Sequence, residues 1–129
     1  MGGTILVIED DPQNQYLVRF LLEQSGFEVI VASDGEAGVD LALSRRPEMV
    51  LMDMLLPKLD GYEATKLIKA DETFTAPVIA LTAYSMKGDR ERVLSAGCDG
   101  YISKPIDPET FVSRVMSFLV PRLDGSARA

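Results

Sequence analysis

Short apolar segments alternate with amphipathic segments along most of the chain. Five segments are dominated by aliphatic and β-branched residues, the pattern of strands buried on both faces of a sheet. They span residues 4–8, 27–32, 49–52, 77–81 and 101–103. Between and after them, apolar residues recur at helical spacing. The expected helices run from Pro12 to Gly26, from Ser33 to Pro47, and over residues 62–70, 87–96 and 108–120.

Regular alternation of strands and helices predicts an α/β fold. Such chains form a parallel sheet with helices on both faces and right-handed crossover connections. No internal repeat or linker divides the 129 residues, and a chain of this length fits one domain. Pro121 is expected to end the last helix. We therefore predict a domain over residues 1–121 and a flexible C-terminal tail over 122–129.

The spacing of apolar residues also assigns an inward face to each helix. The residues expected to face the sheet are, in chain order, Leu17, Phe20, Leu21 and Gln24; Ala37, Leu41 and Ala42; Ala64, Leu67 and Ile68; Val93 and Leu94; and Phe111, Val112, Val115, Met116 and Leu119. The fourth helix has the weakest apolar stripe. It is therefore the helix that we expect to shift most easily.

The composition narrows the classes of function. A net charge of −7 argues against nucleic acid or an anionic membrane as the main partner, since both require a basic surface. No apolar run approaches the roughly 20 residues of a membrane span. The single cysteine, Cys98, cannot form an internal disulfide, which is typical of a protein in a reducing cytoplasm. Histidine is absent, so histidine chemistry has to come from a partner.

Polar side chains follow four of the five predicted strands. Glu9 and Asp10 follow the first strand, Asp53 the third, Thr82 the fourth and Lys104 the fifth. Ligands of open parallel sheets bind outside the carboxyl ends of the strands. If these strands lie side by side, the five side chains converge on one crevice.

Single members of this group also have structural explanations. Asp11 next to them suits a helix cap before Pro12, and the others, taken one at a time, suit solvated loops, turns or exposed surface. Asp53 is the hardest to explain in this way, because it ends a strand that is buried on both faces. The combination at strand ends favours a chemical site.

A cluster of three carboxylates predicts a bound cation. Carboxylates held close together repel, and each then favours protonation. Magnesium relieves this repulsion, because it takes oxygen ligands and is held by one or two carboxylates plus a phosphate. A lysine and a threonine hydroxyl nearby complete the groups needed to transfer a phosphoryl group onto Asp53. The sequence therefore predicts Mg2+-dependent chemistry at this residue.

The same residues resemble the receiver domains of response regulators in two-component signalling. The stretches that carry the resemblance are residues 5–12 (ILVIEDDP), 51–57 (LMDMLLP), 60–61 (DG), 81–83 (LTA) and 100–105 (GYISKP). Residues 86–89 (MKGD) together with 101–106 are similar to single-domain regulators and to receivers attached to hybrid kinases. The resemblance covers nearly the whole chain, and it implies a flavodoxin-like five-stranded parallel sheet of order 2-1-3-4-5.

The resemblance implies a role for each site residue. Asp53 would accept the phosphoryl group from a kinase histidine. Mg2+ would be held by Asp10 and Asp53, by Glu9 through a water molecule, and by the backbone carbonyl of Leu55. Thr82 and Lys104 would bind the phosphoryl oxygens, and Tyr101 would act as an aromatic switch. The Lys104–Pro105 peptide bond is expected to be cis.

The implied partners are a sensor histidine kinase or a histidine phosphotransfer protein, and a downstream protein. The downstream partner is expected on the surface formed by the fourth helix, fifth strand and fifth helix. The kinase is expected to dock around Asn14 and Gln15 on the first helix, together with Ile106. Direct binding of nucleic acid or a membrane is not expected.

Two other functions use related chemistry. A Mg2+-dependent phosphatase with an aspartyl-phosphate intermediate needs a second carboxylate two residues after the nucleophile, where this chain has Leu55. A nucleotide-binding domain needs a glycine-rich turn after the first strand, where this chain is acidic and would repel a pyrophosphate. A signalling switch that modifies only itself is therefore favoured over an enzyme.

The lifetime of a phosphoryl group on Asp53 depends on access for water. Leu55 and Tyr84 stand where other receivers often have polar residues. Leu55 cannot orient a water molecule through its side chain, and Tyr84 is bulky enough to cover the approach. Loss of orientation slows a reaction by orders of magnitude. We therefore predict slow self-dephosphorylation.

Overall fold

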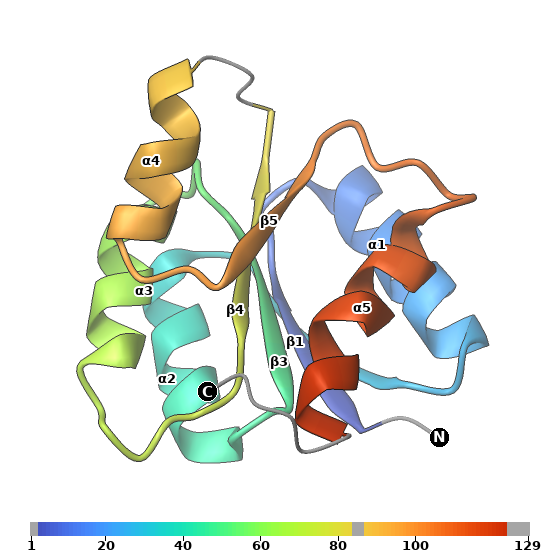
Figure 1. Ribbon diagram of the computed structural model, residues 1–129, viewed down its shortest axis with the longest axis horizontal. Helices are drawn as coiled ribbons and strands as arrows, with labels where there is room; N and C mark the ends of the chain where they lie inside the picture. Colours follow the sequence, from blue (N-terminus) through green and yellow to red (C-terminus); the bar gives the residue numbers. More distant parts are fainter. Residues whose placement is uncertain (1–2, 84–86, 124–129) are drawn as a thin grey trace.

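The computed structural model describes residues 3–83 and 87–123, and it contains the five expected strands and five expected helices. The strands are β1 Thr4–Ile8, β2 Glu28–Ala32, β3 Met49–Asp53, β4 Val78–Thr82 and β5 Gly100–Ser103. The helices are α1 Pro12–Gln24, α2 Gly35–Arg45, α3 Gly61–Lys69, α4 Lys87–Ser95 and α5 Phe111–Leu123. The alternation predicted from the sequence is confirmed (Figure 1).

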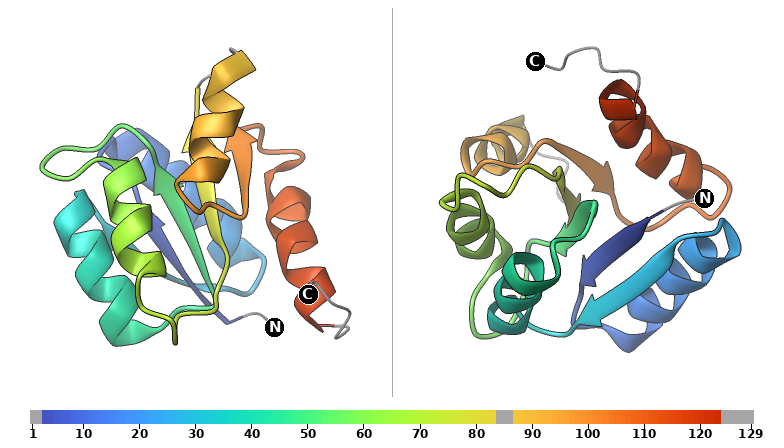
Figure 2. Two further views of the ribbon diagram at one scale, coloured as in Figure 1. Left: turned by 60° about the vertical axis from the view of Figure 1, so that its left-hand side comes forward. Right: turned by 90° about the horizontal axis from the view of Figure 1, so that it is seen from below.

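The strands form one parallel sheet in the order β2-β1-β3-β4-β5. This is the implied order. Helices α1 and α5 cover one face of the sheet, and α2, α3 and α4 cover the other (Figures 1 and 2). All strands point the same way, so their carboxyl ends meet at one edge of the sheet.

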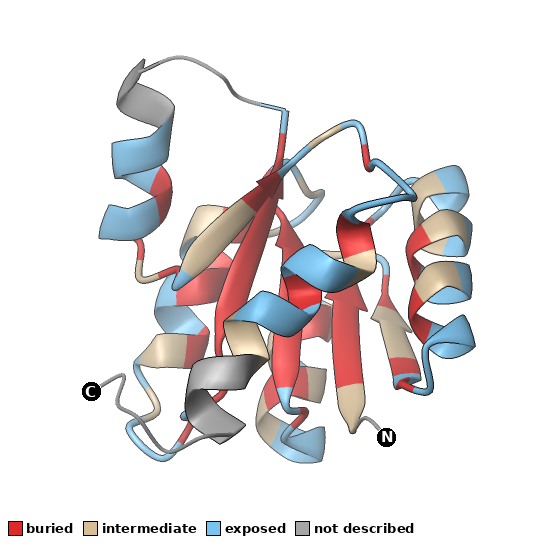
Figure 3. Ribbon diagram, turned by 45° about the vertical axis from the view of Figure 1, so that its right-hand side comes forward, coloured by how far each residue is buried: buried red, intermediate tan, exposed pale blue. Residues whose placement is uncertain are grey.

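The sheet is apolar on both faces, as the unbroken apolar runs predicted. Leu6 and Ile8 of β1 pack in the cluster beneath α2, α3 and α4, whereas Ile5 and Val7 pack in the cluster beneath α1 and α5. This division follows the two-residue period of a strand. Figure 3 shows the result, a buried central sheet with helices exposed on their outer faces.

Aspartate side chains cap two of the helices, but the one aspartate predicted as a cap, Asp11, is not among them. The carboxylates of Asp34 and Asp60 accept hydrogen bonds from the third residue of α2 and α3, at 2.8 and 2.9 Å. Asp11 occupies the corresponding position before α1, yet its side chain makes no such bond. The proline at the start of α1 removes one N–H group that would need a partner there.

The limits of α5 differ from the prediction at both ends. The helix begins at Phe111 rather than Pro108, because Asp107 organises a separate turn in which its carboxylate accepts a hydrogen bond from Glu109 N at 3.0 Å. It continues through Pro121 to Leu123, so the expected end at Pro121 was wrong. A proline in the last turn removes one hydrogen bond without ending the helix. The proposed tail stays a prediction, because residues 124–129 lie outside the described part.

The predicted inward faces were correct in part. Ala42, Ala64, Ile68, Val93, Phe111 and Val115 are buried as predicted, whereas none of the residues predicted to face inward on α1 is among its buried residues. The buried residues of α1 are Val18 and Leu22, while Phe20 is exposed. Leu67, Leu94 and Met116, all expected to face the core, are also exposed. A helix on a sheet buries a narrow stripe, so a shift of one position moves a residue to the surface. None of the described helices is long and apolar enough to cross a bilayer.

Candidate functional site

The register of the sheet brings the predicted site residues to one edge. Ile8 of β1 is paired with Met52 of β3, so Glu9 and Asp53 follow neighbouring positions in adjacent strands. Thr82 ends β4 beside Ser103 of β5. The backbone N–H of Lys104 donates to the carbonyl of Thr82 at 2.8 Å, which extends the pairing of β4 and β5 by one residue.

Three carboxylates and one ammonium group meet at this edge. Oxygen atoms of Glu9, Asp10 and Asp53 all lie within 4.8 Å of one another. Nζ of Lys104 lies 3.1 Å from Oε1 of Glu9 and 3.3 Å from Oδ2 of Asp53. Glu9 and Asp53 are buried, whereas Asp10 is exposed. The sequence-based cluster is therefore present as one contiguous site.

Backbone hydrogen bonds fix the two buried carboxylates. The N–H of Leu55 donates to Oδ1 of Asp53 at 3.1 Å, and the N–H of Asp11 donates to Oε2 of Glu9 at 3.1 Å. In each case the N–H donor is two residues further along the chain than the carboxylate, so the loop after each strand holds the carboxylate at that strand's carboxyl end. One oxygen of each carboxylate is thus engaged by backbone, and the other points toward Lys104.

Burial and charge alter the pKa values at the site. Burial raises the pKa of Glu9, and the nearby charge of Asp53 raises it further against the opposing effects of Asp11 N–H and Lys104. Burial by itself would lower the pKa of Lys104, but the charges of Asp53 and Glu9 outweigh burial and raise it. Lys104 is therefore a firmly charged cation between two carboxylates.

The donor set fits a magnesium ion. Oε1 of Glu9 is fully buried and has no hydrogen bond of good geometry from any described residue, although Lys104 is within ion-pair distance. A single lysine leaves the cluster of three carboxylates with an excess of negative charge. Oxygen ligands from one or two carboxylates, with further positions left for water and phosphate, are what Mg2+ takes in proteins.

A cavity of about 250 Å³ opens above these side chains. Its lining residues are Glu9, Asp10, Asp11, Asn14, Asp53, Met54, Leu55, Thr82, Ala83 and Lys104. Every predicted metal and phosphate residue is in this set. The cavity is large enough for a phosphoryl group with several water molecules, and its walls come from the loops that follow β1, β3, β4 and β5.

Comparison with known proteins agrees with this geometry. The model of the response regulator receiver domain matches residues 5–116. The chain belongs to the response regulator receiver family. It is 43% identical to the polar-differentiation response regulator DivK of Brucella anthropi over 120 residues, covering 92% of this chain and 98% of DivK. As a receiver domain it is a regulatory switch of two-component signalling.

Two solved receiver structures are similar to this chain. The receiver domain of the sensor histidine kinase PA1611 from Pseudomonas aeruginosa, with a magnesium ion coordinated in its active-site cleft, is 39% identical with a TM-score of 0.82. That match covers 98% of this chain and all of PA1611's receiver. The receiver domain of yeast Ssk1, solved with the histidine phosphotransfer protein Ypd1, is 25% identical with a TM-score of 0.85. It covers 92% of this chain and 90% of the other.

Tyr101 lies outside the cavity, on the edge strand β5. Its side chain is half-buried against the cluster beneath α4, and its carbonyl accepts a hydrogen bond from Arg114 of α5 at 3.3 Å. The Lys104–Pro105 bond that follows β5 is cis, as predicted. Tyr101 thus lies between α4 and α5, on the surface where the family resemblance led us to expect a downstream partner.

Some residues around the receiver cleft have roles that the sequence did not indicate. Nε2 of Gln15, expected on a docking surface, donates to the carbonyl of Glu9 and to Oγ of Ser33 at 3.1 Å, so it joins the ends of β1 and β2. Ile106, expected on the same surface, is buried. Asn14 lines the cavity itself. Only the three-dimensional neighbours reveal these roles. Tyr84 lies outside the described residues.

Proposed function

We propose that Asp53 accepts a phosphoryl group from a histidine of a sensor kinase or histidine phosphotransfer protein, and that the phosphorylated chain binds a downstream protein. The observation that carries the proposal is the buried Asp53 carboxylate beside Lys104, at the base of a cavity also lined by Glu9 and Asp10. Family membership supports it, because receiver domains interact with histidine kinases or phosphotransfer proteins.

The chain's own residues prepare Asp53 for transfer. Leu55 N–H holds one carboxylate oxygen, so the other is available to attack phosphorus as the bond to the donor nitrogen breaks. Lys104 is close enough to neutralise charge on the transferred oxygens, and Thr82 lines the same cavity. Positioning and charge stabilisation account for most phosphoryl-transfer catalysis.

Glu9, Asp10, Asp53 and the carbonyl of Leu55 are the proposed Mg2+ ligands. The close carboxylate oxygens and the incompletely bonded buried oxygen of Glu9 support this assignment. A bound Mg2+ ion would neutralise charge on the phosphoryl oxygens. Because the ligands lie at the ends of two adjacent strands, the sheet sets their spacing before any ion binds.

Incubation with acetyl phosphate and Mg2+, followed by intact mass, tests the proposal. We expect a gain of one phosphoryl group that Asp53→Asn and chelator both prevent. Asp10→Ala should remove labelling with the circular dichroism spectrum unchanged, and Asp40→Ala, an exposed acidic residue on α2, is the matched control. Labelling at the normal rate in chelator would contradict the metal assignment. Continuous phosphate turnover would indicate a phosphatase instead.

Partner recognition is proposed on the face formed by α4, β5 and α5. Tyr101 lies at its centre, and α4 is the helix with the fewest buried side chains among those described. Thr82, at the end of β4, connects the phosphoryl site to this region, so its movement toward phosphate would change the environment of Tyr101. Phosphorylation-dependent amide shifts limited to α1 and α2 would contradict this assignment.

Slow loss of the phosphoryl group is proposed from the character of Leu55. Its exposed apolar side chain lies at the mouth of the cavity, where it offers no hydrogen bond to an attacking water molecule. We expect a phosphorylated lifetime of minutes or longer, and faster release in Leu55→Asn and Tyr84→Glu. The measurement is phosphate release from the purified phosphorylated protein. A half-life of seconds in the wild type would show that these residues do not control hydrolysis.

A further inference from the structure

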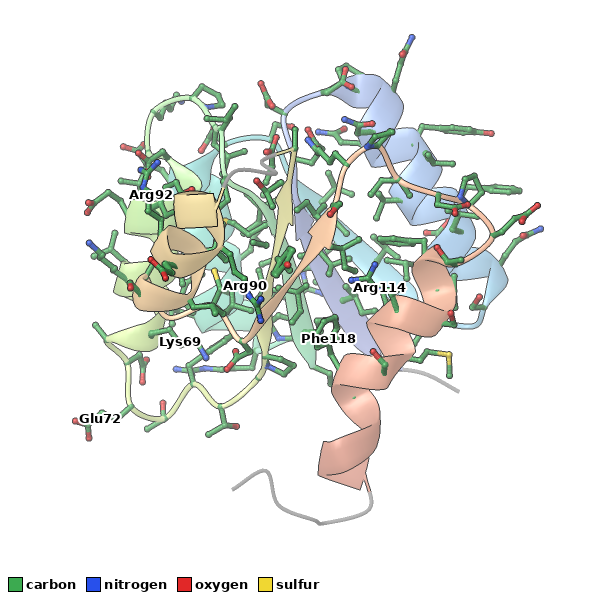
Figure 4. The ribbon with its side chains drawn as sticks, turned by 45° about the horizontal axis from the view of Figure 1, so that its top comes forward. Lys69, Glu72, Arg90, Arg92, Arg114 and Phe118 are labelled. Carbon is green, nitrogen blue, oxygen red and sulfur yellow. The ribbon has the colours of Figure 1, made fainter. Side chains whose placement is uncertain are left out.

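The space between α4 and α5 in front of β5 carries positive charge on an acidic protein. Figure 4 shows Arg90 extending from α4 toward β5, and Arg114 between β5 and α5. Arg114 is fixed there by its hydrogen bond to the Tyr101 carbonyl. Arg90 makes no ion pair with any described side chain. The chain as a whole has a net charge of −7, so these two arginines place positive charge locally on a protein that is negatively charged overall.

Among the side chains that the structure describes, none forms an ion pair with either arginine. Asp99 is held by Lys69 at 2.8 Å, and its carboxylate also accepts a hydrogen bond from Val78 N–H. Glu91 and Arg92 are on the opposite side of α4, where they line a cavity shared with α3. Among the described side chains, therefore, the β5 side of α4 presents a cation and no competing carboxylate.

Apolar side chains lie on the same three elements as the arginines. Leu94 is four residues after Arg90, so both share one side of α4, and its side chain is exposed. Phe118 of α5 lies against Gly100 at the start of β5, where even an added Cβ atom would be 2.4 Å from the ring. Tyr101 lies on β5, where its carbonyl accepts the Arg114 hydrogen bond, and it is half-buried. Tyrosine and arginine around a partly buried apolar centre are typical of protein-binding hot spots.

From this arrangement we infer that the partner contributes an acidic segment, whose carboxylates pair with Arg90 and Arg114 while an apolar side chain contacts Leu94 and Tyr101. The inference rests on the partner face proposed above and specifies the chemistry of its ligand. Charge complementarity favours one kind of binding partner. Two separated arginines can pair with carboxylates spaced along a short acidic peptide segment. An extended polyanion such as nucleic acid would meet repulsion from the rest of the protein. A second copy would have to bring an acidic surface to the same site.

The test uses a fluorescein-labelled peptide of alternating glutamate and leucine, and its glutamine counterpart, measured by fluorescence anisotropy on the full chain before and after treatment with acetyl phosphate. We expect the acidic peptide to bind, the glutamine peptide to bind more weakly, and the affinity to fall as salt is raised. Arg90→Gln and Arg114→Gln should each weaken binding about fivefold. Arg45→Gln, on α2, should leave it unchanged. Glutamine at 114 retains a donor for the Tyr101 carbonyl.

Amide shifts on peptide addition locate the contact independently of affinity. Shifts at Arg90, Leu94, Tyr101 and Arg114 support the inference. Equal binding of both peptides, no effect of either substitution, or shifts elsewhere would overturn it. So would displacement of the peptide by an oligonucleotide at equal concentration, or the same shifts produced by raising protein concentration alone. If Asp53 cannot be phosphorylated but the acidic peptide binds through the arginines, the proposed function fails and this inference stands.

Discussion

Helices α3 and α4 cover the same face of the sheet and have nine residues each, yet they are held in different ways. Helix α3 buries Gly61, Ala64, Thr65 and Ile68, and Asp60 caps its first turn. Among the described side chains of α4, only Val93 is buried. The comparison shows that one receiver face combines a firmly packed helix with a lightly packed one, and that the lightly packed helix borders the proposed partner surface.

The two helices are joined at defined points. The guanidinium of Arg92 lies 4.3 Å from the centre of the Tyr62 ring, and Lys69 of α3 pairs with Asp99 at 2.8 Å, just after α4. These contacts lie toward the carboxyl-terminal half of α4 and the segment that follows it. Movement of α4 relative to α3 therefore has to occur about these contacts or break them.

Truncating one apolar residue on each helix gives the largest expected contrast. Ile68→Ala should lower the free energy of unfolding by about 2–5 kcal/mol, because it leaves a cavity in the core. Leu94→Ala on α4 should cost less than about 0.5 kcal/mol, since its side chain is exposed. Urea denaturation measures both. Equal losses would mean that α4 is packed as firmly as α3.

Removing the side-chain cap of α3 should give the next largest loss of stability. Asp60→Ala should cost about 1 kcal/mol, because Glu63 N–H loses its carboxylate acceptor. Asp60→Asn keeps an oxygen acceptor and serves as the control. Its loss of stability should be only a few tenths of the loss caused by Asp60→Ala. A stability unchanged by alanine would show that solvent satisfies this N–H equally well.

The contact between the helices should contribute a smaller energy. Arg92→Ala is expected to cost about 0.5–1 kcal/mol through loss of the cation–π contact with Tyr62. A double-mutant cycle with Tyr62→Leu isolates the pairwise energy. Arg90→Ala, on the other side of α4, is the matched control. A coupling energy of zero would remove this contact from the description of how α4 is held.

The smallest expected effect is the pH-dependent contribution to the free energy of unfolding from Asp71, which lies just after α3. Hydrogen bonds from Thr73 Oγ1 and N–H, and from Arg46, lower the pKa of Asp71 below its ordinary value of 3.8. A lowered pKa adds stability above that ordinary value, and the gain is lost as pH falls through the folded-state value. The stability difference between wild type and Asp71→Ala should therefore shrink on acidification. Glu72→Ala, at an exposed neighbour, should show no such trend.

The sequence predicted the sheet, its order through family resemblance, and the convergence of the site, because strand ends in a parallel sheet are fixed by the apolar runs themselves. It failed where a position depends on the rotation of a helix about its axis. Phe20 and Leu94 are apolar residues beside the buried stripe, and periodicity alone does not separate them from Val18 and Val93. The hydrogen bonds of Gln15 to β1 and Ser33 required the folded arrangement of three elements.

The loop between β3 and α3 has little room on its inner side. A Cβ atom on Gly35 would lie 1.9 Å from the carbonyl oxygen of Leu59, and one on Gly61 would lie 2.6 Å from the carbonyl oxygen of Asp53. Gly35 at the start of α2 and Gly61 at the start of α3 therefore allow the loop to pass close to both helices. For protein engineering, Gly35 and Gly61 are positions that tolerate no side chain. Leu55, on the same loop, has an exposed side chain, so its proposed effect on the lifetime of the phosphoryl group can be varied by a library of substitutions without rebuilding the fold.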